Sequence, residues 1–448
     1  MILDAETLLR KLRELEAKGG TPSRYVIAFS GGLDSTVLLH ALVTLRDKLA
    51  APLLAIHVDH GLHADSAVWS KHCREIADRF DVDYQSCSVN VQLESGKGPE
   101  ASARDARYNA LHAELYAGDW LMSAHHREDQ AETLLLNLIR GSGPMGVAGI
   151  GSIRRFGPGW LVRPLLDTSR QALEAYASRE KLDWVEDPTN ADRRFDRNFL
   201  RHDILPRLGA RWPDISARLQ RSASHAGEAS QLLTNLAAID LDTVGGRPEK
   251  LAIDKLLQLS PARQRNVLRH AVRQLGLATP TAMQLARIQK EVIPAREDAQ
   301  PLVTWTGAAV RRYRNNLYLL PETPQALPAC IDVPTEGQTQ AEVALGPGLG
   351  VLRFLAGGTP GLSQDVMKRG VQVRFRQGGE EFQPLGQLHT RKLKKLLQEE
   401  GVVPWMRERL PLVFSGDELV AVGDLWLAAK AVGEPGVSLR WQDRPALH

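Results

Sequence analysis

The chain has 448 residues, and at roughly 150 residues per domain this length predicts about three domains, each able to bury a core without disulfide or metal staples. Hydrophobic residues make up 43% of the chain and charged residues 24%, a balance that excludes a largely disordered chain, a collagen and a coiled-coil rod. The formal net charge is only +3, which neither requires nor excludes a nucleic-acid partner.

The cysteines and the N-terminal residues indicate in which cellular compartment the protein is expected. Cys73, Cys87 and Cys330 are odd in number and form no CxxC pair, so the sequence predicts no disulfide framework, no thiolate zinc site and a reducing environment. Residues 1–20 are acidic by the fourth position and have the pattern of an amphipathic helix, not of a secretion signal. No apolar run approaches the roughly 20 residues that a membrane helix needs. We therefore expect a cytoplasmic, soluble protein with no membrane partner.

Strand and helix patterns alternate over the first two hundred residues. The strand patterns cover residues 25–30, 53–59, 84–89, 119–125 and 161–166. The helix patterns begin at residue 34 and then cover residues 66–80, 101–117, 128–140 and 169–181. This alternation predicts an α/β fold with a Rossmann-like, doubly wound parallel sheet. Ligands of such sheets bind at the C-terminal ends of the strands.

The composition changes after residue 206. The pattern is all-helical from 215 to about 288, and short strands are expected at 302–305, 308–314 and 317–321. Three prolines between 321 and 330 predict a linker, followed by mixed α/β patterns. The predicted domains are a catalytic domain (1–210), a mostly helical middle domain (211–325) and a small mixed α/β C-terminal domain (326–448).

The most specific motif is the glycine loop Ser30-Gly31-Gly32-Leu33-Asp34-Ser35, between a predicted strand and a predicted helix. Glycines permit a tight turn, and amides at the start of a helix attract anions. Ser30 and Ser35 add hydroxyl donors, and Asp34 can hold a Mg²⁺ ion that is bound to phosphates. A capped glycine turn without a ligand is the alternative, and no GxxxxGK motif is present. The context favours a nucleotide phosphate site.

A second polar motif, His57-Val58-Asp59-His60-Gly61-Leu62, ends the second predicted strand. Its HxDHxxH spacing suggests a metal site and hence a metallohydrolase. One strand end rarely supplies a whole metal cage, however, and a loop above a nucleotide needs polar residues in any case. We therefore expect His57 and Asp59 to border the nucleotide.

A third motif covers residues 125–133 and opens a predicted helix. His125, Asp129 and Glu132 share one helical face if the helix reaches back that far. The carboxylates could bind Mg²⁺ or a substrate ammonium, and ordinary capping with a solvated face is the alternative. A different apolar stripe is expected to pack on the sheet: Leu134, Leu135, Leu138 and Ile139.

Two glycine- or arginine-rich segments follow. Residues 141–146 contain a literal GxGxxG, but it follows a helix and so predicts a loop and no dinucleotide site. Residues 190–207 contain five arginines and three aspartates. Arginine suits bidentate contact with the phosphates of ATP or RNA, and a salt-bridged helix surface is the alternative.

The last third of the chain has a local positive charge. Residues 374–409 contain eight Lys and Arg and five Asp and Glu, which is a net charge of +3. A solvated helix face is the simpler interpretation and RNA contact is the other. The candidate RNA-binding residues are Arg374, Arg376, Arg391, Lys392, Lys394 and Lys395.

These motifs carry a resemblance that covers nearly the whole chain. The loop SGGLDS resembles the pyrophosphate-binding loop of the N-type ATP pyrophosphatases. The segments HVDHGL, HHREDQAET, EDPTN with RNFLR, and RFRQGGE with PWMR resemble those of the tRNA(Ile)-lysidine synthetases, in order. One departure is Glu128, where that family has aspartate.

The resemblance implies a ligase that forms a C–N bond, with ATP and Mg²⁺ as cofactors and CAU-anticodon tRNA(Ile) and free L-lysine as partners. ATP would adenylate O2 of the wobble cytosine, and the lysine ε-amine would then attack C2 and displace AMP. The lysidine product would change tRNA identity from methionine to isoleucine.

The resemblance also implies roles for individual residues. The ATP-binding residues would be Ser30, Gly31, Gly32, Leu33, Asp34, Ser35, His57 and Asp59. The catalytic residues would be Asp34, Asp129, Glu132, Arg107, His125, Arg197 and Arg201, with Asp34 and Asp129 holding Mg²⁺.

Three other interpretations stay open from the sequence. A tRNA thiolase would need cysteine pairs, and an amidotransferase-type synthetase would need a glutaminase unit; neither is visible. A nonenzymatic, ATP-binding RNA adaptor would keep the glycine loop without needing Asp129 and Glu132. The sequence does not decide whether the chain forms a homodimer, how elongator methionine tRNA is rejected, or whether Asp129 or Glu132 binds lysine.

Overall fold

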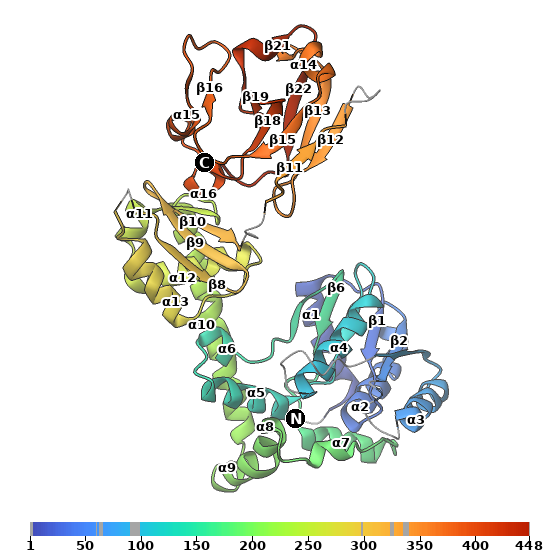
Figure 1. Ribbon diagram of the computed structural model, residues 1–448. Helices are drawn as coiled ribbons and strands as arrows, with labels where there is room; N and C mark the ends of the chain where they lie inside the picture. Colours follow the sequence, from blue (N-terminus) through green and yellow to red (C-terminus); the bar gives the residue numbers. More distant parts are fainter. Residues whose placement is uncertain are drawn as a thin grey trace. The chain divides into compact units, whose positions relative to one another are not determined.

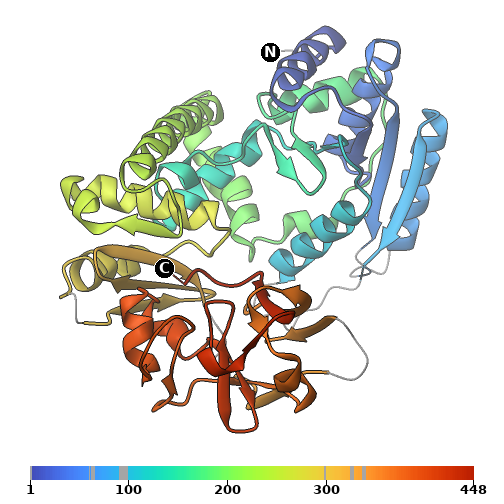
Figure 2. The ribbon, with the colours of Figure 1, turned by 90° about the horizontal axis from the view of Figure 1, so that it is seen from above.

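The computed structural model describes residues 3–59, 61, 66–89, 99–296, 299–322, 327–334 and 340–447, without the side chains of residues 99–101 and 340. The chain forms two compact units, Met1–Leu233 and Thr234–His448. The long helix α10 (Ile215–Thr243), yellow-green in Figures 1 and 2, contributes residues to both. The division into three domains near residues 210 and 325 stays a prediction. Within the described ranges, no helix has the length and hydropathy needed to cross a membrane.

The first unit is built on a six-stranded sheet with the strand order β3-β2-β1-β4-β6-β5. Figure 1 labels β1, β2 and β6 of this sheet. The strands are β1 (Tyr25–Ala28), β2 (Leu53–Asp59), β3 (Asp83–Ser88), β4 (Trp120–Met122), β5 (Ile153–Phe156) and β6 (Gly159–Val162). All neighbours are parallel except β5, which pairs antiparallel with β6. The predicted doubly wound parallel sheet is confirmed. The edge strand β5 was not predicted, because its residues lack an alternating apolar pattern.

Helices cover both faces of this sheet because β1 is apolar on both sides. Tyr25 and Ile27 belong to a core that also contains buried side chains of α1 (Ala5–Gly19), α2 (Leu33–Val43), α3 (Ser66–Arg79) and α7 (Arg170–Arg179). Val26 belongs to a second core with Leu111 of α4 (Pro99–Ala113). Adjacent strand residues point to opposite faces, so a strand that is apolar at every position needs a cover on each side.

Helical segments next to the sheet carry the remaining motifs of the first unit. They are α5 (Arg127–Ile139), α6 (Pro144–Val147), η2 (Pro188–Ala191), α8 (Asp196–Phe199), the π-helix η3 (Leu200–Ile204) and α9 (Leu205–Arg211). Two expectations are wrong here. Of the stripe predicted on α5, Leu134 is buried, but Leu138 and Ile139 are 50% and 75% exposed, so the C-terminal end of this helix lacks an apolar cover. The segment 141–146 is not only a loop, because Pro144 starts the short helix α6.

The first part of the second unit combines helices with an antiparallel sheet of order β7-β10-β9-β8. The strands are β7 (Lys250–Ala252), β8 (Leu302–Trp305), β9 (Ala308–Tyr313) and β10 (Asn316–Pro321), and the helices are α11 (Ile253–Gln258), α12 (Pro261–Gln274), α13 (Ala282–Arg287) and η4 (Ile288–Val292). The three predicted strands are confirmed. The all-helical interpretation of 215–288 is wrong at β7, since a three-residue strand is too short to show a period of two.

The remainder of the second unit is dominated by antiparallel strands in two five-stranded sheets, ordered β11-β15-β18-β19-β20 and β12-β13-β22-β14-β21. The strands are β11 (Cys330–Asp332), β12 (Gln340–Ala344), β13 (Val351–Gly358), β14 (Gly361–Leu362), β15 (Gln372–Phe375), β16 (Glu381–Phe382), β17 (Arg391–Lys392), β18 (Pro411–Ser415), β19 (Glu418–Val422), β20 (Trp426–Leu427), β21 (Val432–Gly433) and β22 (Gly436–Gln442). The short helices are α14 (Gln364–Lys368), α15 (Leu393–Glu399) and α16 (Pro404–Arg407).

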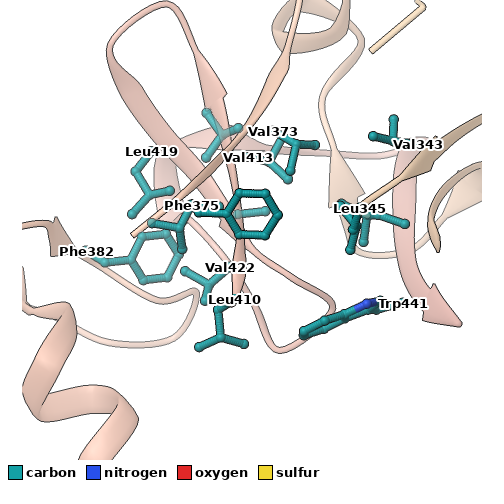
Figure 3. Close-up of a cluster of buried hydrophobic side chains, with 14 of the residues drawn as sticks. Val343, Leu345, Val373, Phe375, Phe382, Leu410, Val413, Leu419, Val422 and Trp441 are labelled. Carbon is teal, nitrogen blue, oxygen red and sulfur yellow. The ribbon is translucent and has the colours of Figure 1, made fainter. Parts of the chain in front are cut away.

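One hydrophobic core joins these two sheets. Figure 3 shows part of it, with Phe375 and Val413 from the first sheet and Val343 and Trp441 from the second. Residues 323–326 of the predicted linker lie outside the described residues. The expected mixture of helices and strands is present in this part of the chain, but strands predominate.

Candidate active site

The glycine loop lies where β1 ends and α2 begins, as expected. Gly31 has φ +77°, and a Cβ placed on it would lie 2.7 Å from the Sγ atom of Cys73. Gly32 is the N-cap of α2 and makes no side-chain cap, so polar groups of a ligand can meet the first amides of the helix. The Oγ atoms of Ser30 and Ser35 lie 3.1 Å apart beside it. This turn suits an anion such as a nucleotide phosphate.

The buried side chain of His57 packs next to the glycine loop. Its Nδ1 atom lies 3.0 Å from the carbonyl oxygen of Phe29 and 3.4 Å from the Sγ atom of Cys73. Burial lowers the pKa of His57, which favours the neutral ring. Asp59 accepts a hydrogen bond of 2.8 Å from the backbone N–H of Gly61.

The metal-site interpretation of the same motif depends on His60 and His63, which lie outside the described residues, as does Leu62. Among the described residues, no group of three or more His, Cys, Asp or Glu side chains is arranged to hold a metal ion by itself.

Asp34, in the first turn of α2, faces two positive groups from other elements. The Nη1 atom of Arg170 donates to both of its carboxylate oxygens, at 3.0 and 2.9 Å. The Nε2 atom of His126 lies 3.8 Å from one of them. Burial raises the pKa of Asp34, while the charges of His126 and Arg170 act in the opposite direction.

His126 is the N-cap of α5 and connects three carboxylates. Besides Asp34, its ring lies 3.1 Å from an oxygen of Glu128 and 3.5 Å from one of Asp129. Its backbone N–H donates to Asp129 at 2.9 Å, as in a capping box. Burial alone would lower the pKa of His126, but the hydrogen bond to Glu128 and the neighbouring carboxylates raise it.

A fourth carboxylate, that of Glu132, is fully buried, with 0% exposure, and is bound by two arginines. The Nε atom of Arg197 donates to it at 2.9 Å, and the Nε atom of Arg201 at 2.7 Å. Arg201 also donates to Asp129 at 3.1 Å, which joins the two carboxylates of α5 through one guanidinium. Burial raises the pKa of Asp129, but the histidine and arginine charges around it lower it overall.

The structure therefore brings together five of the predicted catalytic residues: Asp34, Asp129, Glu132, Arg197 and Arg201. It does not place His125 on their helix: α5 begins at Arg127, so the condition for a shared i, i+4, i+7 face, that the helix reaches back to His125, is not met. His125 instead pairs with the hydroxyl of Ser123 at 2.6 Å. Arg107 lies on α4, outside the elements that supply the ion pairs, and its charge acts on His57.

Sequence reasoning missed three residues of this cluster, His126, Glu128 and Arg170. The first two belong to the motif 125–133, in which only other positions were assigned roles. Glu128 accepts hydrogen bonds from His126 and from the backbone N–H of Arg170. Arg170 belongs to no motif, so no signal in the sequence could have singled it out.

The candidate RNA-binding residues of the second unit differ in their surroundings. Arg376 pairs with Glu380 at 3.2 Å and is largely buried, and Arg391 pairs with Glu399. Arg374 stacks on Phe414, with its guanidinium 4.8 Å from the ring centre. Three lysines are exposed around α15, whose leucines are buried: Lys392, Lys394 and Lys395. These lysines are the freely solvated basic groups of the set.

Three family models match successive parts of the chain. Residues 5–208 match a PP-loop domain, residues 251–318 a TilS substrate binding domain and residues 371–441 a TilS substrate C-terminal domain. The first match contains the glycine loop and the whole ion-pair cluster.

Curated relatives match over nearly their full length. The tRNA(Ile)-lysidine synthase of Methylococcus capsulatus is 41% identical over 92% of this chain and 94% of its own. That of Alkalilimnicola ehrlichii is 42% identical over 98% and 96%, and that of Pectobacterium atrosepticum 43% identical over 88% and 89%. At these identities and coverages, the chain belongs to the tRNA(Ile)-lysidine synthase family.

Proposed function

We propose that the protein ligates L-lysine to C2 of the wobble cytidine of CAU-anticodon tRNA(Ile), with ATP converted to AMP and pyrophosphate through an adenylated cytidine. The names of its relatives and the match to the PP-loop domain support the reaction. The observation that carries the proposal is the position of Asp34: it belongs to the glycine loop and faces the same imidazole as Asp129. A phosphate site and a carboxylate cluster therefore meet at one edge of the sheet.

The donor set fits Mg²⁺ as a cofactor. Asp34 and Asp129 lie 3.8 and 3.5 Å from the same Nε2 atom of His126, so they supply hard oxygen ligands on one side of the site. Mg²⁺ is commonly held by one or two carboxylates together with substrate phosphates, and the phosphates would lie at the glycine turn that precedes Asp34. When bound, Mg²⁺ would neutralise charge on the departing pyrophosphate.

The chain's own residues would orient and stabilise the reacting groups. The amides of the glycine loop would bind the pyrophosphate. Arg197 and Arg201 are 20% and 32% exposed and are anchored by Glu132, so they are fixed positive charges for the negative charge that develops in adenylation. Glu132 is fully buried with an arginine on each oxygen, so we assign it the positioning of these arginines. The contact with the lysine ammonium or Mg²⁺ is assigned to Asp129, whose side chain is 13% exposed.

The second unit would bind the tRNA. Two of the three matched models lie in it, and their descriptions refer to the substrate. The exposed lysines 392, 394 and 395 can neutralise phosphates of the RNA backbone. We further propose a cytoplasmic location and the three-domain division at about 210 and 325.

A transfer assay tests the reaction. The protein is incubated with ATP, labelled lysine and CAU-anticodon tRNA(Ile), and label on the RNA is measured. We expect transfer that requires ATP and release of pyrophosphate. Absence of transfer by folded protein with the correct tRNA contradicts the proposal and favours the ATP-binding RNA adaptor.

Asp34→Ala tests the role of the cluster in the first step. We expect this variant to lose pyrophosphate release while it remains folded. Asp47→Ala is the matched control, since Asp47 is exposed and lies beyond α2 in the 3-10 helix Arg46–Lys48. Full activity of the Asp34 variant would refute the assignment of Mg²⁺ to this carboxylate.

A further inference from the structure

Arg170 forms an ion pair with Asp34, the carboxylate that is proposed above to bind a divalent cation. Its Nη1 atom lies 3.0 and 2.9 Å from the two oxygens of Asp34, and the two side chains are 40% and 29% exposed. A guanidinium in this position neutralises the carboxylate but leaves neither oxygen free of a positive partner. A divalent cation bound by Asp34 would lie close to this guanidinium, and two positive groups that share one carboxylate repel each other.

Arg170 is held in this position from several sides. Its backbone N–H, at the first residue of α7, donates to Glu128 at 2.8 Å. Its Nε atom donates to Glu174, one turn later, at 3.1 Å. Ser169 caps the same helix by accepting from the N–H of Ala172 at 3.2 Å. The residue is therefore anchored by its backbone, and its guanidinium already has a second carboxylate partner.

Glu128 links the helix that carries Arg170 to a second helix, α5. The Oε2 atom of Glu128 accepts both from the ring of His126 at 3.1 Å and from the N–H of Arg170 at 2.8 Å. It thereby ties the start of α5, which carries Asp129, to the start of α7. The carboxylates that face the glycine loop and the arginine that neutralises one of them are thus parts of one hydrogen-bonded network.

We propose that Arg170 is a positioning residue of the ATP site, which holds the Asp34 carboxylate neutralised and in place and competes with a divalent cation for it. Cation binding displaces the guanidinium from Asp34, and Glu174 retains it. The proposal rests on the proposed function only in taking Asp34 as a cation ligand.

The test is a titration of the nucleotide-free, full-length protein with Mn²⁺, in which unbound Mn²⁺ is measured by electron paramagnetic resonance. In Arg170→Gln the competing charge is lost, and we expect the Kd for Mn²⁺ to fall about 3- to 10-fold, a modest change because the pair is partly exposed. Arg170→Lys keeps the charge and is expected to bind Mn²⁺ like the wild type. Arg179→Gln is the matched control, because Arg179 lies on the same helix and pairs with Glu180.

The outcomes separate three roles. A Kd for Mn²⁺ that is unchanged or higher in Arg170→Gln, or no Mn²⁺ binding by any of these proteins, overturns the proposal. A lower melting temperature of Arg170→Gln with an unchanged Kd for Mn²⁺ shows that Arg170 only stabilises the fold. Weaker binding of a nonhydrolysable ATP analogue with an unchanged Kd for Mn²⁺ identifies it as a phosphate ligand. Because the titration needs neither tRNA nor lysine, its result is independent of the transfer assay.

Discussion

Replacing Gly31 by alanine tests why the phosphate loop has glycine at its turn. Gly31 has φ +77°, and a Cβ there would lie 2.7 Å from the Sγ atom of Cys73. Cys73 is 0% exposed in the core of the first unit, so its sulfur cannot move aside into solvent. The substitution therefore destabilises the folded state in two ways: alanine disfavours the left-handed backbone conformation, and its Cβ collides with a buried atom.

The two terms have comparable magnitudes. A left-handed conformation costs an L-residue about 1–2 kcal/mol. An atom forced into a packed core costs about 1–3 kcal/mol. We therefore expect Gly31→Ala to lower the free energy of unfolding of the first unit by about 2–5 kcal/mol. We also expect weaker binding of an ATP analogue, since the loop amides would shift.

A double-mutant cycle with Cys73→Ala separates the terms. Without the sulfur, Gly31→Ala should cost only the backbone term, so its cost should be smaller by about 1–3 kcal/mol in this background. Urea denaturation of the four proteins measures the difference. Gly141→Ala is the control, because Gly141 has φ +69° and no heavy atom lies within 4 Å of its Cβ position. An equal cost of Gly31→Ala in both backgrounds refutes the role of Cys73.

Three further predictions concern other buried groups. Glu132→Gln removes a buried charge that faces Arg197 and Arg201, and we expect a loss of about 3 kcal/mol in urea denaturation; a loss below about 1 kcal/mol would contradict the buried ion pairs. Cys330 is exposed, whereas burial raises the pKa of Cys73 to about 12, so iodoacetamide at pH 8 should label Cys330 first and Cys73 only after unfolding; early labelling of Cys73 would count against its position. The pKa of His57 is lowered in the folded protein, so below about pH 6.5 the unfolded chain takes up a proton that the folded chain does not, and stability falls as pH falls. The urea midpoint should therefore decrease less between pH 7.5 and 5.5 in His57→Gln than in the wild type, and equal decreases would exclude this contribution.

Local patterns in the sequence were enough to place most of the first unit. The strand expected at 53–59 is β2, and the helix expected at 128–140 is α5 shifted by one residue. The glycine loop could also be read locally, because a buried strand, a glycine turn and a helix follow one another within a few residues. The predicted pair Asp129 and Glu132 shares a partner in Arg201, as residues three apart on a helix can.

Only the tertiary structure decided which distant residues complete the site. Arg170 is 136 residues from Asp34, and Arg197 is 65 residues from Glu132, so no spacing rule connects them. The same limit explains the errors at Leu138 and Ile139, because helical periodicity defines an apolar face without showing what covers it. The sequence by itself determined the local elements and the phosphate loop, since these depend on neighbouring residues. The arginine that neutralises Asp34 and the buried pairs of Glu132 depend on how separate helices pack, and packing brings together residues that the chain keeps far apart.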